Sequence, residues 1–176
     1  MSQLYDRVAL IGLGLIASSL FWAMKRDGLA GEVVGYARSS ETRATAREIG
    51  LCDRIYDTAV EAVEGADLVV LCVPVGAMDS VAREIAPALK QGATVTDVGS
   101  VKRAIVDAVA PHIPEGVHFV PSHPLAGTEH SGPRSGFAEL FEDRWFLIVP
   151  VEGSDANAVD RIETLWQAMG SKTARM

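Results

Sequence analysis

The segment 122–132, which reads SHPLAGTEHSG, places two histidines and a glutamate among hydroxyl-bearing residues and glycines. A surface turn would need only the small and hydroxyl-bearing residues, so His123 and Glu129 need another explanation. An imidazole titrates near neutral pH and is the side chain most often used to accept or donate a proton in catalysis. We therefore expect His123 to be a catalytic base, whereas His112 and His118 are expected to be structural or solvated.

A second polar segment, DVGSVK at 97–102, follows another apolar run. Gly99 suits a turn, and Ser100 suits capping of the helix expected to begin near Val101, so a structural role could explain both residues. The carboxyl ends of parallel strands share one edge of a sheet, and ligands bind at that edge. Ser100 and His123 could therefore also bind one small ligand together. The residues alone leave open both the structural role and the ligand-binding role of Ser100.

The sequence GLGLIA at 12–17 predicts a dinucleotide-binding turn. It matches the pattern G-x-G-x-x-G/A between a predicted strand and a predicted helix. In this pattern Gly12 permits the tight turn, Gly14 lets the backbone approach the pyrophosphate, and Ala17 allows close packing of the helix on the strand. The alternative is a glycine turn with a purely structural role. The residues expected to contact the dinucleotide here are Gly12, Leu13, Gly14, Leu15 and Ile16.

The residues that follow the second predicted strand favour NADP over NAD. Ala37 lies about 20 residues beyond Ala17, where an acidic side chain would bind the 2′-hydroxyl of the NAD ribose. Arg38, with Ser39 and Ser40, could instead bind a 2′-phosphate through charge-assisted hydrogen bonds. The alternative is a solvated Arg38 that stacks on adenine, which suits either cofactor.

Six short apolar runs predict the strands that position these residues, at 7–12, 32–37, 67–73, 93–98, 118–122 and 145–150. The runs at 67–73 and 145–150 lack polar alternation, which indicates strands covered on both faces. Apolar periodicity predicts helices over 15–26, 77–90 and 155–168, and residues 171–176 resemble the start of one more strand. The repeated strand–helix order predicts an α/β fold of the Rossmann type, doubly wound, with a mainly parallel sheet and helices on both faces.

Val73 and Pro74 end the predicted strand at 67–73, at the edge of the sheet where such folds bind their ligand. We expect both residues to line the dinucleotide site, although a proline turn needs no ligand to explain it. The irregular stretch 121–136 lies at the same edge, and its length favours a functional segment over an idle loop.

The composition indicates one globular domain over residues 1–176. Hydrophobic residues make up 48% of the chain and charged residues 22%, and the formal net charge of −7 argues against a nucleic-acid partner. No run of about 20 apolar residues could span a membrane, so we expect a cytoplasmic protein without a membrane partner. The two cysteines, Cys52 and Cys72, and the histidines at 118, 123 and 130 lack the spacing of metal ligands. No metal site is therefore expected.

Three motifs together resemble the prephenate/arogenate (cyclohexadienyl) dehydrogenase family of tyrosine biosynthesis, in its N-terminal nucleotide-binding domain. They are GLGLIASSL at 12–20, DVGSVK at 97–102 and HPLAGTEHSG at 123–132, of which the third is the most specific. The resemblance implies an NAD(P)-dependent oxidative decarboxylation of prephenate or arogenate, in which His123 accepts the proton of the ring 4-hydroxyl as hydride leaves the same carbon. It also implies that Ser100 is both a catalytic and a cofactor-binding residue, bonded to the substrate hydroxyl and the histidine, and that Glu129 gates the pocket entrance.

The same resemblance implies a second, mostly helical domain after this one, which forms a homodimer and supplies an arginine for the substrate carboxylate. A chain without that domain is expected to bind the dinucleotide with little or no turnover. Two alternatives stay open at this point: another NAD(P)-dependent reductase of the β-hydroxyacid or imine-reducing type, and a non-catalytic NAD(P)-sensing module. The sequence also leaves open the choice between prephenate and arogenate and any feedback by tyrosine.

Overall fold

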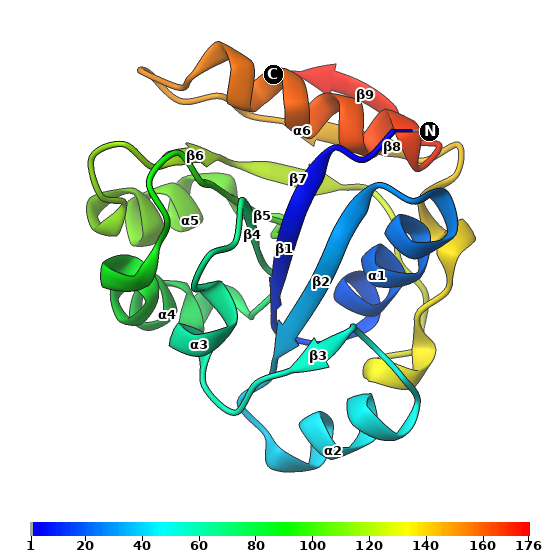
Figure 1. Cartoon of the computed structure of the whole chain (residues 1–176). Helices are drawn as coiled ribbons and strands as arrows, with labels where there is room; N and C mark the ends of the chain where they lie inside the picture. Colours follow the sequence, from blue (N-terminus) through cyan, green and yellow to red (C-terminus); the bar gives the residue numbers. More distant parts are fainter. Residues whose placement is uncertain (1) are drawn as a thin grey trace.

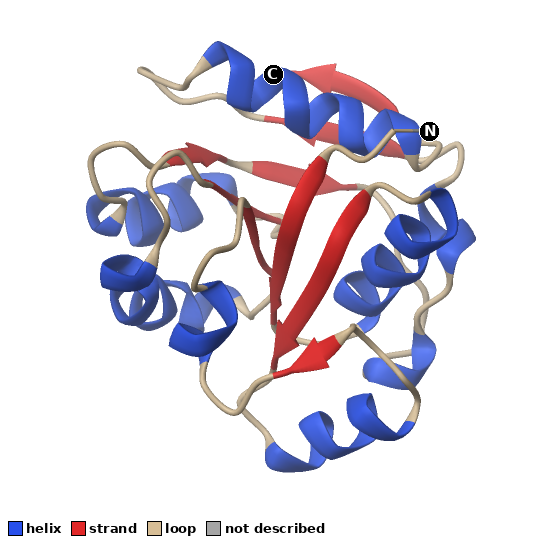
Figure 2. Ribbon diagram, viewed as in Figure 1, coloured by secondary structure: helices blue, strands red, loops and turns tan. Residues whose placement is uncertain are grey.

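A six-stranded parallel sheet forms the centre of the protein, in a computed structural model that describes residues 2–176 (Figure 1, Figure 2). Its strands are β1 (Tyr5–Ile11), β2 (Ala30–Tyr36), β3 (Arg54–Ile55), β4 (Leu68–Leu71), β5 (Thr94–Asp97) and β6 (His118–Val120). They stand in the order β3-β2-β1-β4-β5-β6, and every neighbouring pair is parallel. The order reverses between β1 and β4, which confirms the doubly wound arrangement predicted from the sequence.

Helices cover both faces of this sheet. They are α1 (Leu15–Asp27), α2 (Ser40–Glu48), α3 (Ala59–Val63), α4 (Met78–Ile85), α5 (Lys102–Val109) and α6 (Ala156–Ala168). Figure 1 shows α1 on one side of the sheet and α3, α4 and α5 on the other. Along β1, Val8 and Leu10 pack with residues of α1, while Ala9 and Ile11 pack with residues of α3, α4 and α5. Both faces of the strand are therefore covered, as its apolar run requires.

A second sheet of three strands holds the segment that carries His123. Its strands are, in spatial order, β7 (Ser122–Pro124), β8 (Trp145–Ile148) and β9 (Lys172–Arg175). β7 and β8 are antiparallel, whereas β8 and β9 are parallel. Helix α6 lies along this sheet in Figure 1, and its Trp166 stacks on Phe146 of β8 with the ring centroids 4.0 Å apart. Because both rings belong to the same core cluster as residues of α1, the small sheet is packed onto the main body of the fold.

The predicted strand at 118–122 is wrong as a single strand. It is divided at Pro121 into β6, which ends the parallel sheet, and β7, which belongs to the small sheet. A proline has no N–H group to donate, so it cannot continue a ladder of backbone hydrogen bonds on both sides. The chain changes sheets at this residue, directly before His123.

The predictions at 145–150 and 77–90 also need correction. β8 alternates between exposed and buried residues, with Trp145 exposed and Phe146 buried, and so is not covered on both faces. All its side chains are apolar, which conceals the alternation in the sequence. Over 77–90 only α4 is α-helical, and 3₁₀ turns flank it at Val75–Ala77 and Ala86–Ala88. Pro87 cannot donate to the α-helical ladder, which accounts for the early end of α4.

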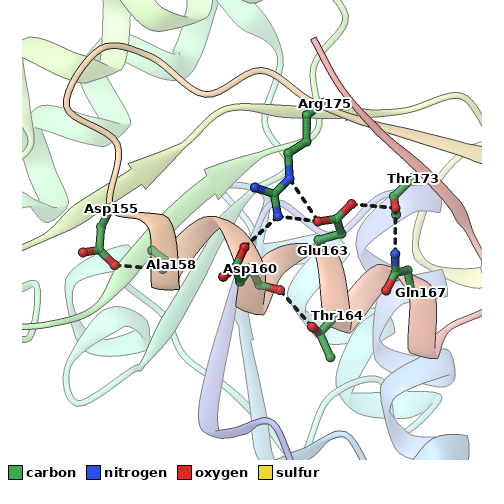
Figure 3. Close-up of polar contacts among 8 residues, drawn as sticks. All are labelled: Asp155, Ala158, Asp160, Glu163, Thr164, Gln167, Thr173 and Arg175. Atoms are coloured by element: carbon green, nitrogen blue, oxygen red, sulfur yellow. Dashed lines mark hydrogen bonds and ion pairs between the residues drawn. The ribbon is translucent and has the colours of Figure 1, made fainter.

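Polar contacts join β9 to α6 (Figure 3). Arg175 pairs with Asp160 and Glu163, with nitrogen–oxygen distances of 2.7 and 2.5 Å. Thr173 donates its hydroxyl to Glu163 and accepts a hydrogen bond from Gln167, each at 2.9 Å. The hydrogen bond from Arg175 is the main cause that holds the pKa of Glu163 below its usual value. The strand predicted from residues 171–176 is therefore present as β9 and is bound along the helix.

Candidate functional site

The turn between β1 and α1 leaves open space at the helix start. Gly12 has a φ of +96°, and a Cβ atom there would lie 2.7 Å from the carbonyl oxygen of Cys72, so only glycine fits. A Cβ atom on Gly14 would meet nothing within 4 Å. Helix α1 begins directly after Gly14 with no side-chain cap and no acidic residue in its first turn. Its first N–H groups can therefore bind an anion such as phosphate.

A cavity of about 510 Å³ lies at the carboxyl ends of β1, β2 and β4. Four of the predicted cofactor residues line it, namely Gly12, Arg38, Val73 and Pro74. The other residues that line the cavity are Tyr36, Ala77, Ser80, Val81 and Glu84. This is the point at which the strand order reverses, where doubly wound sheets bind their ligands. The open turn and the adjoining cavity fit a dinucleotide, whose phosphates would lie at the start of α1.

The remaining residues of the turn differ in exposure. The side chain of Leu13 is buried in the core, whereas Leu15 and Ile16 are half-buried at its edge. Leu13 could therefore contact a dinucleotide only through its backbone.

Arg38 is exposed at the end of β2, and within residues 2–176 it forms no ion pair. The hydroxyl of Ser39 accepts a hydrogen bond from the backbone N–H of Thr42 at 3.3 Å, so Ser39 caps α2. Ala37 is buried. Arg43, which the sequence did not single out, donates to the carbonyl oxygens of Ala37 and Arg38 at 2.7 and 2.9 Å. It therefore fixes the backbone that presents Arg38.

A buried polar cluster lies where β5 ends and β7 begins. The carboxylate of Asp97 contacts the ammonium group of Lys102, and it accepts hydrogen bonds from the N–H groups of Gly99 at 2.9 Å and Ser122 at 3.2 Å. Lys102 also donates to the carbonyl oxygen of Ser122 at 2.5 Å. Burial raises the pKa of Asp97 and lowers the pKa of Lys102, while the attraction between the two groups opposes both shifts. Neither side chain was predicted to contribute to the site.

His123 follows this cluster on β7, opposite Leu147 of β8. Its side chain is half-buried, and its Nδ1 atom is buried without a hydrogen-bond partner within the described residues. Within residues 2–176, no carboxylate binds the ring through Nδ1. The neighbouring residues Ser122 and Pro124 are both buried, which restricts the backbone of β7.

Ser100 does not cap α5, which was one of the two roles that the sequence left open. The N-cap residue of α5 is Val101, which makes no side-chain hydrogen bond. The carboxylate of Asp97 binds the N–H of Gly99 and closes the turn in place of a serine cap. Ser100 is exposed at this turn, and across residues 2–176 no hydrogen bond joins it to His123.

Glu129 lies on an exposed loop, and its carboxylate is 3.2 Å from the ring of the neighbouring His130. The exposed fractions of these two side chains are 83% and 73%, so solvent surrounds both. Glu129 is not among the residues that line the 510 Å³ cavity, and within residues 2–176 it makes no hydrogen bond to Nδ1 of His123.

Two buried serines of α1, which the sequence did not single out, hold the end of the same loop. Ser19 accepts a hydrogen bond from the backbone N–H of Phe137 at 3.1 Å. A Cβ atom on Gly136 would lie 2.1 Å from the hydroxyl of Ser18, so the loop backbone packs directly on the helix. The signal in the sequence was a pair of small polar residues on an otherwise apolar helix face.

Residues 21–175 match the family described as prephenate dehydrogenase, nucleotide-binding domain. Cyclohexadienyl dehydrogenase of Zymomonas mobilis is 42% identical over 168 residues, which cover 96% of this chain and 57% of that protein. Prephenate dehydrogenase of Bacillus subtilis is 29% identical, with 100% of this chain and 48% of that protein covered. The chain thus spans about half the length of the curated relatives it matches.

Solved structures give the same relationship. The structure of prephenate dehydrogenase from A. aeolicus in complex with hydroxyphenyl propionate and NAD+ is similar with a TM-score of 0.89 and 27% identity, over 100% of this chain and 60% of that chain. Synechocystis arogenate dehydrogenase is similar with a TM-score of 0.87 and 27% identity, over 97% of this chain and 59% of that chain. Within residues 2–176, no helix has the length and apolar character to cross a membrane. The chain belongs to the prephenate dehydrogenase family, and residues 21–175 match its nucleotide-binding domain.

Proposed function

We propose that this chain is the dinucleotide-binding part of an NAD(P)-dependent dehydrogenase that oxidatively decarboxylates prephenate or arogenate. The observation that carries the proposal is the place of His123. It stands on β7, which follows the carboxyl end of β6, on the edge of the sheet where β1, β2 and β4 border the 510 Å³ cavity. A proton-accepting group and a dinucleotide site on one edge are what such a dehydrogenase needs.

In this proposal the turn and the cavity hold the cofactor. The backbone from Gly12 to Ile16 would bind the pyrophosphate, and Val73 and Pro74 would line the wall beside it. When bound, the nicotinamide ring supplies the acceptor for a hydride. Arg38 would bind the 2′-phosphate of NADP, and this preference is supported by its freedom from ion pairs within residues 2–176 and by Ala37, which lacks an acid to bind a 2′-hydroxyl.

His123 would accept the proton of the substrate's ring 4-hydroxyl. Removal of this proton raises the electron density on oxygen and favours departure of the hydrogen on the same carbon with its electron pair. The bond to the ring carboxylate then breaks, its electrons enter the ring, CO2 leaves, and the ring becomes aromatic. Within residues 2–176 Ser100 makes no hydrogen bond through its hydroxyl, which supports its proposed role as a partner of the substrate hydroxyl.

Glu129 would gate the entrance, which requires the exposed loop to move toward the site when substrate binds. We further propose that residues 1–176 form one dinucleotide-binding domain. Homodimerisation and binding of the substrate carboxylate would fall to a helical part corresponding to the remaining length of the relatives, which are about twice as long. A cytoplasmic location stays a prediction.

An assay of the full-length protein tests this proposal. Purified protein is given prephenate or arogenate with NAD or NADP, and both reduced cofactor and released CO2 are measured. We expect one CO2 for each reduced dinucleotide with at least one substrate. Reduction without CO2 would favour a β-hydroxyacid type of dehydrogenase, and calorimetric binding of the dinucleotide without any turnover would favour a sensing module. Either result would contradict the proposal.

A further inference from the structure

The backbone of Ser122 faces β5 after the chain has left the parallel sheet. Backbone hydrogen bonds join Val149 to Pro121 and Leu125 to Trp145, at 2.9 and 2.8 Å, on either side of the β7–β8 pairing. In an antiparallel pair such bonds occur at alternate residues, so Ser122 falls at a position whose N–H and C=O point away from β8. β6 has meanwhile ended at Val120, and β5 offers no further ladder partner.

Asp97 and Lys102 supply the missing partners. The N–H of Ser122 donates to Oδ1 of Asp97 at 3.2 Å, and the carbonyl oxygen of Ser122 accepts from Nζ of Lys102 at 2.5 Å. The hydroxyl of Ser122 donates to the carbonyl oxygen of Asp97 at 2.7 Å and lies 2.9 Å from the hydroxyl of Thr96. Lys102 and Asp97 also contact each other, so the N–H and the C=O of Ser122 are both bound by one ion pair.

This pair is buried to a degree that stability alone does not explain. The exposed fraction is 0% for the side chain of Asp97 and 16% for that of Lys102. A buried ion pair contributes little more to folding than well-packed apolar residues would, because both charges lose their hydration. A role in fixing geometry accounts for its presence at this junction.

We propose that Asp97 and Lys102 are positioning residues that hold the peptide of Ser122 and thereby fix the imidazole of His123. This inference rests on the proposed function of His123. The buried Nδ1 atom of that ring has no hydrogen-bond partner within residues 2–176, so the backbone must do what an orienting carboxylate does elsewhere. A shift of about 1 Å in a reacting group can cost about 100-fold in rate.

Three variants test the pair: K102M, K102R, and the double variant D97N/K102M. The double variant leaves no unpaired buried charge, so we expect it to fold with the unfolding transition of the wild type. K90M is the matched control, since Lys90 also pairs with an aspartate, Asp67, at 2.6 Å, on the opposite edge of the sheet. Two quantities are measured: amide exchange of Ser122 by NMR on this chain, and kcat with dinucleotide Kd on the full-length protein.

For the double variant, we expect amide exchange at Ser122 to rise by about tenfold or more, because asparagine has one oxygen where the two carboxylate oxygens of Asp97 accept from Gly99 and Ser122. For K102M and the double variant, we expect kcat to fall by about 10- to 100-fold, with the dinucleotide Kd within about twofold of the wild type. K102R should recover part of the kcat, and K90M should change neither quantity.

A double variant that folds and keeps either the wild-type exchange at Ser122 or the wild-type kcat would overturn the inference. The exchange measurement does not depend on the chemistry of His123. Suppose that amide exchange at Ser122 rises in the double variant, while a variant without His123 keeps its activity. The proposed function of His123 would then be wrong, but Asp97 and Lys102 would still be shown to fix the peptide of Ser122.

Discussion

His123 is held differently from many catalytic histidines. A carboxylate or a carbonyl group often binds Nδ1 and fixes both the ring and its tautomer. Here Nδ1 is buried and has no hydrogen-bond partner among the described residues. The ring therefore depends on the strand that carries it, which explains why polar groups gather on the backbone of Ser122 rather than on the imidazole itself.

The proposed preference for NADP rests on Arg38. We predict that R38A weakens NADP binding by at least about tenfold more than NAD binding, because a charge-assisted hydrogen bond to the 2′-phosphate is lost. Calorimetry with each dinucleotide measures the two dissociation constants. R103A is the control, since Arg103 is an exposed arginine on α5 and not at the cavity. An equal loss of affinity for NAD and for NADP would show that Arg38 does not bind the 2′-phosphate.

The sequence could suggest candidate residues for the site but not their contacts. The glycine turn and the pair Val73–Pro74 each follow a predicted strand of the parallel sheet, whereas His123 follows a predicted strand that the structure divides into β6 and β7. Of the two roles that the sequence left open for Ser100, the structure excludes the helix cap, because the more distant Asp97 closes that turn instead. The partners of Lys102 could not be predicted, since its hydrogen bond to Ser122 spans 20 residues and depends on how two sheets meet.

At the scale of elements, the two glycines of the β1–α1 turn differ in the space around them, so we predict different effects of their substitution. We predict that G12A lowers the free energy of unfolding by about 1–3 kcal/mol, because φ is positive and the new Cβ meets the carbonyl of Cys72. G14A should leave the free energy of unfolding within about 1 kcal/mol of the wild type but weaken dinucleotide binding about tenfold or more, because its Cβ enters the open space at the helix start. Urea denaturation and calorimetry measure the two quantities. A G14A variant that binds the dinucleotide as the wild type does would place the phosphates elsewhere.

Four strands of the parallel sheet, β1, β2, β4 and β5, could be predicted because their apolar runs end in glycine or polar turns. β3 was not predicted, since its two residues, Arg54–Ile55, form no apolar run. The pairing of β7, β8 and β9 into a separate sheet could not be predicted either. Pro121 divides a run that reads as one strand, and β8 hides an alternating pattern behind side chains that are all apolar. Which strands pair across such a break depends on packing between distant segments, including the stacking of Trp166 on Phe146.

At the scale of the whole molecule, one edge of the main sheet gathers the features of the site. The glycine turn, the cavity and the His123 strand all follow carboxyl ends of parallel strands. The chain spans 57% of the Zymomonas mobilis relative and 48% of the Bacillus subtilis relative. In our account this part binds the cofactor and provides the proton acceptor.

The central claim is that His123 accepts the substrate proton, and kcat of H123N in the full-length protein tests it most directly. H130N is the matched control, because His130 lies on the same segment but is exposed, and within residues 2–176 its ring pairs only with Glu129. We predict that H123N lowers kcat by about 100- to 10,000-fold while the dinucleotide Kd stays within about twofold, and that H130N keeps its activity. A folded H123N enzyme with the kcat of the wild type would contradict the account.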